Sequence, residues 1–217
     1  MTEVILERVP RRTFAAALDW PGWARSDRTE EAALARLADY AERYAPVASR
    51  AGVPFDPGEL TVVETLAGDA STDFGVLAAV AAADSRPLTG ADAGRQAALV
   101  EAAWAVFADV VAGAPAELRK GPRGGGRDRD KIVAHVVEAE GSYARKLGVK
   151  MKIPAGAGLD DAAELRAAVL AVLRQASDGS AVLPKGWPPR YAARRFAWHV
   201  LDHAWEIEDR SDLGAEP

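Results

Sequence analysis

The chain has 217 residues, of which 49% are hydrophobic and 27% are charged, the composition of a folded protein with a substantial core. The absence of cysteine excludes a disulfide framework, a thiolate nucleophile and a cysteine-ligated metal, so a bound metal must take histidine nitrogens or carboxylate oxygens. The formal net charge of −5 argues against nucleic acid as the main partner, because phosphate binding needs a basic surface.

The chain shows no pattern of a membrane-spanning or secreted protein. No run of about 18 apolar residues occurs. The N-terminal segment MTEVILERVPRR lacks a secretory pattern. We therefore expect a cytoplasmic protein with no membrane partner.

The first 89 residues have a mixed pattern that predicts a small α+β module (residues 1–89). Residues 4–6 and 14–18 predict two strands separated by Pro10, and residues 60–66 predict a further strand. Thr29 is the expected N-cap of a helix with an apolar face of Leu34, Leu37, Tyr40 and Tyr44. Residues 67–89, punctuated by glycine, aspartate and proline, are expected to be irregular.

From about residue 90 the pattern is helical. Amphipathic helices are predicted at residues 91–111, 128–147, 160–176 and 189–209, and the connections between them are rich in glycine and proline. Four such helices predict a four-helix bundle over residues 90–217. The predicted fold class is therefore α+β, a small N-terminal ββα module followed by a four-helix bundle.

The only three histidines, His135, His199 and His203, are the predicted metal ligands. His199 and His203 are four residues apart in the last helix, so they share one face, and His135 lies on the apolar stripe of the second helix. All three imidazoles are therefore expected to point inward, where they should be neutral and need partners. A divalent metal satisfies all three at once and keeps a position open for water or substrate.

Two points about the histidines stay open. They could be hydrogen-bonded core residues that bind no metal. The identity of a bound metal is also open, because zinc, nickel, iron and manganese all accept imidazole.

The placement of the histidines resembles a known family. His135 in the second helix, followed by the segment WHVLDH (residues 198–203) in the last helix, is similar to the DinB/YfiT-like superfamily over about residues 90–212. The resemblance assigns the family's metal triad to His135, His199 and His203. It implies a divalent metal, frequent dimerisation and, in some members, metal-assisted transfer onto a low-molecular-weight thiol or isomerisation.

The N-terminal module has a resemblance of its own. The segments FAAALDWPGW (residues 14–23) and RTEEAAL (residues 28–34) are similar to the HicB-like partial double-stranded-RNA-binding fold. No ribbon-helix-helix segment follows them, so antitoxin activity is not implied. The resemblance implies an accessory module that packs on the bundle or mediates dimers.

Several residues near the histidines have two interpretations each. Glu206 and Glu138 each follow a histidine by three residues, so each could orient a ligand or act as a general base, or be solvated. Asp202 is expected on another face of the helix. Arg194 and Arg195 could line a mouth above the metal or be solvated. Trp198 and Trp205 could form a dimer or domain interface or pack within the chain.

The connector of residues 120–130 is basic and rich in glycine. It lacks the Lys-Ser/Thr ending of a phosphate-binding loop, so a flexible connector with Asp128 capping the next helix is favoured. Arg123 and Arg127 would nevertheless favour an anionic substrate group at that helix N-terminus.

These features predict a metal-dependent enzyme of hydrolase or thiol S-transferase type. No Ser-His-Asp order, GxSxG elbow or dinucleotide fingerprint occurs, which argues against triad chemistry. The expected partners are a small-molecule substrate, a thiol being one candidate, and a second copy in a homodimer. The alternative is a non-catalytic metal- or ligand-binding protein with an oligomeric or regulatory role.

Overall fold

The computed structural model describes residues 1–121 and 125–211, and it begins with a four-stranded sheet. The pairs β1–β2 and β2–β3 are antiparallel, whereas β1–β4 is parallel. The predicted strands are confirmed. The sequence does not predict β3, because its residues lack an apolar alternation and are extended through their pairing with β2. In sheet order, the strands are β3 (Ala24–Asp27), β2 (Arg12–Ala17), β1 (Thr2–Val9) and β4 (Leu60–Ala67).

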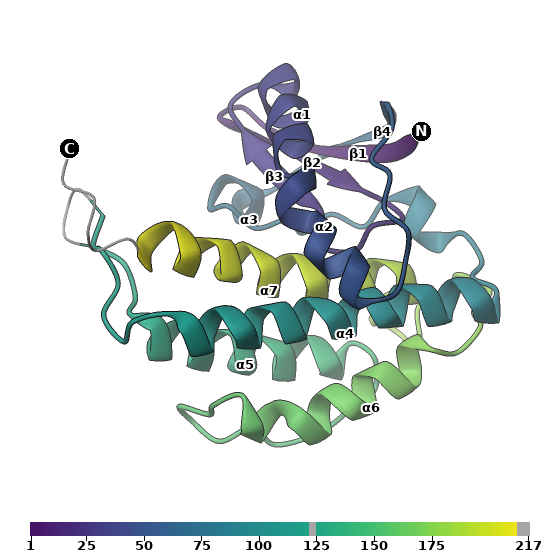
Figure 1. Ribbon diagram of the computed structural model, residues 1–217. Helices are drawn as coiled ribbons and strands as arrows, with labels where there is room; N and C mark the ends of the chain where they lie inside the picture. The colour runs from purple at the N-terminus through teal and green to yellow at the C-terminus, as the bar shows by residue number, and fades with distance from the viewer. Residues whose placement is uncertain (122–124, 212–217) are drawn as a thin grey trace.

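Two helices follow β3, where the sequence predicts one. α1 (Glu30–Asp39) begins after Thr29, whose side chain accepts a hydrogen bond from a backbone amide of the first turn at 3.2 Å, as predicted. α2 (Ala41–Arg50) follows Tyr40, whose ψ of 1° ends the first helix. The predicted helix is therefore two helices that meet at Tyr40 (Figure 1).

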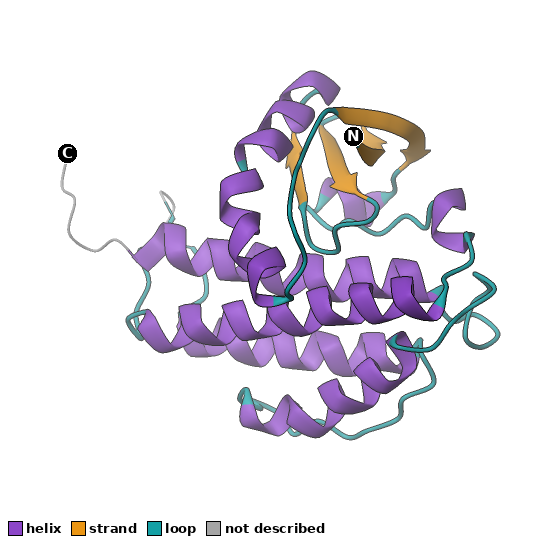
Figure 2. Cartoon of the chain, turned by 45° about the vertical axis from the view of Figure 1, so that its right-hand side comes forward, coloured by secondary structure: helices purple, strands orange, loops and turns teal. Residues whose placement is uncertain are grey.

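Both faces of the sheet are buried. One face, which includes Val4 and Leu6, belongs to the main hydrophobic core together with the helices. The other face, which includes Ile5 and Phe14, packs against the segment that follows β4 and against Trp198. The sheet therefore forms the middle of its module, with helices on one side and a connecting segment on the other (Figure 2).

The segment that follows β4 contains only short helices. They are α3 (Ala70–Asp73) and the 3-10 helix η1 (Ala82–Ser85), and much of the rest of residues 67–89 has no regular structure, as expected. We call residues 76–85 the strap, because they run across the second face of the sheet and place apolar side chains against it.

The C-terminal region contains the four predicted helices. α4 and α7 pack against each other along their length, and α6 lies on the side of the bundle away from the sheet (Figure 1). Residues 191–201 of α7 are all buried, because the strap and sheet cover one side of this helix and the other bundle helices cover the rest. The bounds are α4 (Gly90–Gly113), α5 (Arg129–Arg145), α6 (Ala163–Leu173), preceded by the 3-10 helix η2 (Asp160–Ala162), and α7 (Pro189–Ser211).

α4 is the one helix among the described residues that is long and apolar enough to cross a membrane, with a mean hydropathy of 1.3 over 18 residues. Charged residues interrupt its apolar sequence, so the helix contains no uninterrupted apolar run of about 18 residues. About 44% of that window is buried inside the protein. Trp104 and Phe107 of α4 pack in the main core, so the composition also suits a central bundle helix.

The sheet module and the bundle share one hydrophobic core. Gly22, in the Pro-Gly turn before β3, has φ of +94°, and a Cβ added there would lie 2.6 Å from Cδ1 of Leu201. The backbone of the turn therefore lies so close to α7 that a side chain at residue 22 would clash with Leu201. Nearby, Arg25 of β3 pairs with Asp202 of α7 at 2.9 Å. Asp202 thus lies away from the histidine face, as expected.

The two tryptophans of α7 pack within the chain. Trp198 meets Phe14 edge to face with ring centroids 5.9 Å apart, and Trp205 meets Tyr40 in the same way at 5.0 Å. The tryptophans are 3% and 2% exposed. Their aromatic surface therefore lies between the sheet module and α7, which fits the domain-interface and intramolecular alternatives and leaves almost none of these side chains exposed for a dimer interface.

Candidate metal centre

The three histidines converge between α5 and α7. The ring centroid of His135 lies 5.2 Å from that of His199 and 5.1 Å from that of His203, and the two α7 rings are 4.8 Å apart. One ring nitrogen from each residue lies within 4.8 Å of those from the other two. The three residues therefore form one cluster that could hold a metal ion.

The antiparallel packing of α5 and α7 creates this cluster. His135, early in α5, lies beside His199 and His203, whereas Tyr143, two turns later, lies beside His199 and Arg195. Residues four apart share a helix face, so successive turns of α7 present Arg195, His199 and His203 to α5. The predicted i, i+4 pair and the third histidine thus meet because the two helices run in opposite directions.

Burial keeps two of the imidazoles neutral. His199 is 7% exposed, and burial lowers its pKa well below the ordinary value of 6.5, with His203 and His135 lowering it further. Burial is also the main cause that lowers the pKa of His135, and His203 adds to it. Metal binding needs the neutral imidazole, so both groups are in the form that a cation requires.

The ring nitrogens fit a divalent cation. Nδ1 of His199 is buried and has no hydrogen-bond partner among the described residues, a state that costs free energy unless another group satisfies it. Zn–N bonds of about 2.0–2.1 Å place tetrahedral ligand nitrogens ~3.4 Å apart. The ring nitrogens lie within 4.8 Å of one another, so they would have to move closer together around a bound ion. Three imidazoles suit zinc, nickel, iron and manganese alike.

Glu206 contacts the cluster, whereas Glu138 does not. Nδ1 of His203 lies 2.8 Å from Oε2 of Glu206, and Nη1 of Arg210 donates to Oε1 of Glu206 at 2.6 Å. Burial works to raise the pKa of Glu206, but the hydrogen bond from His203 and the charge of Arg210 outweigh it and lower the pKa. Glu138 is exposed and acts on His135 through its charge alone. Of the two interpretations, orientation of a ligand fits Glu206 and solvation fits Glu138.

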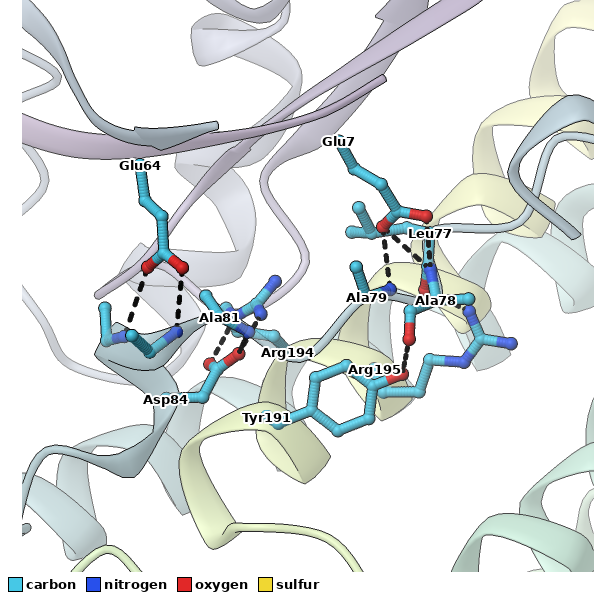
Figure 3. A network of polar contacts seen from close by, with 12 residues as sticks. Glu7, Glu64, Leu77, Ala78, Ala79, Ala81, Asp84, Tyr191, Arg194 and Arg195 are labelled. Atoms are coloured by element: carbon cyan, nitrogen blue, oxygen red, sulfur yellow. Dashed lines mark hydrogen bonds and ion pairs between the residues drawn. The ribbon is translucent and has the colours of Figure 1, made fainter. Parts of the chain in front are cut away.

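Arg194 and Arg195 neither line an open mouth nor face solvent, so both interpretations are wrong. Arg194 is 2% exposed and forms a two-pronged ion pair with Asp84, at 2.9 and 2.5 Å (Figure 3). Arg195 is 8% exposed and donates to the carbonyl of Leu77 and to the hydroxyl of Tyr143. Buried guanidinium groups need such partners. The strap supplies Asp84 and the carbonyl of Leu77, and α5 supplies Tyr143.

Polar groups, of which Glu7 and Tyr191 are buried, bind the strap from both sides, as Figure 3 shows. On the sheet side, the carboxylate of Glu7 accepts hydrogen bonds from the amides of Ala78 and Ala79, and that of Glu64 accepts from two amides of η1. On the other side, the Tyr191 hydroxyl donates to the carbonyl of Ala78 at 2.8 Å. The sequence pattern does not single out Glu7, Glu64 or Tyr191. The signals available were Glu64 inside the predicted strand of residues 60–66 and Glu7 directly after that of residues 4–6.

The described residues of the connector before α5, 114–121 and 125–128, form no helix or strand, and the phosphate-loop interpretation receives no support from them. Asp128 stands at the N-cap position of α5, but its carboxylate accepts hydrogen bonds from the amide of Leu118 at 3.2 Å and from Lys120 instead of capping the helix. Arg127 is exposed, and its charge contributes to the lowered pKa values of His135 and His199. Arg123 lies outside the described residues.

Comparisons with known proteins give no relative: no family model, no curated protein and no solved structure matches the chain. Function is therefore inferred from the geometry of the histidine cluster and its surroundings.

Proposed function

We propose that the protein is a metal-dependent enzyme of the DinB-like type, in which His135, His199 and His203 bind one divalent cation. The observation that carries this proposal is the approach of three ring nitrogens from two helices to within 4.8 Å of one another. A divalent cation in such a site lowers the pKa of a water molecule or a thiol and makes it a nucleophile near neutral pH. The reaction class is hydrolysis or transfer onto a low-molecular-weight thiol.

The charges around the cluster favour an anionic small molecule. The ligand set contains no carboxylate, so three neutral imidazoles leave the charge of a divalent cation uncompensated. Arg127 adds positive charge nearby, since it helps to lower the pKa values of His135 and His199, whereas the carboxylates of Glu138 and Glu206 act on the pKa of His135 in the opposite direction. A thiolate or a substrate carboxylate is therefore favoured at the open position. His135 and His203 are only partly buried, which supports an approach from their side of the cluster.

Elemental analysis tests the metal site directly. We expect the purified protein, dialysed against zinc, nickel, iron(II) or manganese and then against buffer, to retain about one metal per chain, the stoichiometry of a single three-ligand site. The variant His199→Ala should retain almost none. Glu208→Ala, an exposed change on the same helix, is the matched control and should behave as the wild type. The proposal would be contradicted if the wild type retained no metal and its melting temperature did not change when metal was added.

Activity tests the enzyme assignment. Free cysteine with 1-chloro-2,4-dinitrobenzene reports thiol transfer, and 4-nitrophenyl acetate reports hydrolysis. We expect one of these activities to depend on metal and to be lost in His203→Ala, while the fold of that variant persists. A protein that binds metal but accelerates neither reaction would contradict catalysis with these probes and favour the non-catalytic metal-binding alternative.

A further inference from the structure

The carboxylate of Glu206 has one defined partner for each of its oxygens. Oε2 lies 2.8 Å from Nδ1 of His203, and Oε1 accepts a hydrogen bond from Nη1 of Arg210 at 2.6 Å. An ionised carboxylate can only accept hydrogen bonds, so the proton of the contact with His203 belongs to Nδ1. A neutral imidazole that carries its proton on Nδ1 keeps the lone pair on Nε2 for another partner.

Arg210 connects this carboxylate to the loop before α5. Its Nε donates to the carbonyl of Arg119 and its Nη2 to the carbonyl of Arg127, both at 2.8 Å. Arg119 also contacts Arg210 through the backbone, where the amide of Arg119 donates to the carbonyl of Arg210 at 2.9 Å. The planar guanidinium fork therefore bridges the Glu206 carboxylate and two points of the loop, an arrangement that a lysine ammonium does not reproduce.

We propose that Glu206 is a positioning residue, which holds His203 in the Nδ1–H tautomer with Nε2 free for a cation, and that Arg210 makes this orientation depend on the loop. The proposal rests on the proposed function, because the orientation matters only if His203 is a ligand. Carboxylate partners of ligand imidazoles fix ring orientation and raise ligand basicity, and losing one costs about 10–100-fold in metal affinity. The described part of the loop, residues 114–121 and 125–128, is therefore connected to His203 through the side chains of Arg210 and Glu206.

The tautomer can be measured without any metal, which separates this proposal from the proposed function. In the metal-free protein, at a pH at which the His203 ring is neutral, its ring ¹⁵N shifts should show a protonated Nδ1 and an unprotonated Nε2. Glu206→Ala should remove this preference. Glu206→Gln keeps an acceptor oxygen for Nδ1 and should restore it. If His203 keeps the same tautomer in Glu206→Ala, or if Glu206→Gln behaves as Glu206→Ala does, the positioning role is wrong.

Metal affinity gives the second readout. Titration with Co²⁺, followed by its visible absorption and by competition with a chelator, should show affinity about 10–100-fold weaker in Glu206→Ala and a smaller loss in Glu206→Gln. Glu208→Gln, an exposed glutamate two positions along α7, should match the wild type. Equal Co²⁺ affinity in Glu206→Ala and Glu208→Gln would overturn the proposal. If no variant binds Co²⁺ and the tautomer still follows Glu206, the proposed function fails and the positioning role stands.

The loop connection has its own test. Arg210→Lys keeps the positive charge next to Glu206 but cannot reach both loop carbonyls at once. We expect faster amide hydrogen exchange at residues 119–121 and 125–128 together with a several-fold weaker Co²⁺ affinity. Faster exchange with unchanged affinity would show that the loop does not act on the centre, and this part of the proposal would be withdrawn.

Discussion

The imidazole ring of His135 on α5 stands nearly perpendicular to that of His203 on α7, with an interplanar angle of 87° and centroids 5.1 Å apart. The lone pairs of an imidazole lie in the plane of its ring, so rings that cross steeply can direct nitrogens to one point, whereas stacked rings cannot. The ring of His199 crosses the other two at 66° and 87°. These ring angles are compatible with three ligands that share a cation.

Metal should stabilise the folded protein. The cluster exists only when α5 and α7 are packed together, so a cation binds the folded chain in preference to the unfolded one. At a free metal concentration 100 times Kd, the free energy of unfolding should rise by about 2.7 kcal/mol. Urea denaturation with and without metal measures the increase. His135→Ala should abolish it and Glu208→Ala should preserve it. A wild type without any increase would contradict the metal site.

The buried pair of Arg194 and Asp84 should be a large contributor to stability. Asp84→Asn leaves a guanidinium that is 2% exposed without its counter-charge, which should lower the free energy of unfolding by about 3–5 kcal/mol. Glu101→Gln removes an exposed pair with Arg174 and should cost less than ~1 kcal/mol. Chemical denaturation compares the two variants. Similar losses in both would mean that Arg194 finds another partner in the strap.

Gly22 should tolerate no side chain. Gly22→Ala combines a φ of +94° with a Cβ that lies 2.6 Å from Cδ1 of Leu201 and 3.1 Å from Ala197. The backbone strain and the overpacking together should cost about 2–5 kcal/mol. Gly52→Ala is the control, because its φ of +68° is also positive but no atom lies within 4 Å, so it should cost only about 1–2 kcal/mol. Equal thermal stability of the two variants would show that the turn can move off α7.

Stability should fall steeply at alkaline pH. Burial raises the pKa of Tyr191 to about 12 and raises that of Tyr44 further. In the unfolded chain these tyrosines lose their protons near pH 10, so above that pH ionisation stabilises the unfolded state and not the folded state. Each tyrosine should lower the free energy of unfolding by about 1.4 kcal/mol per pH unit between its two pKa values.

Denaturation between pH 9 and 12 measures this dependence. Tyr191→Phe should make the fall of the free energy of unfolding with pH less steep above pH 10, by the contribution of one tyrosine, about 1.4 kcal/mol per pH unit. An unchanged slope in that variant would show that its hydroxyl ionises as freely in the folded protein as in the unfolded chain.

Local pattern alone predicted much of the fold. The helices near residues 90, 129, 163 and 189, and the N-cap at Thr29, follow from periodicity and capping chemistry, which depend on neighbours a few residues away. The spacing of His199 and His203 likewise decides that they share a face. The placement of His135 on an apolar stripe then predicted the cluster, because apolar stripes of bundle helices face one another.

Packing between distant segments decided the rest. β3 is extended because it pairs with β2, and Arg194 and Arg195 are buried because the strap crosses α7 with groups that match them. Glu206 has the same spacing from its histidine as Glu138 has from His135, yet only Glu206 meets the imidazole. The sequence by itself determined which residues share a helix face. Only the tertiary structure decided which of them are buried and paired, because burial depends on segments that the chain brings together from far apart.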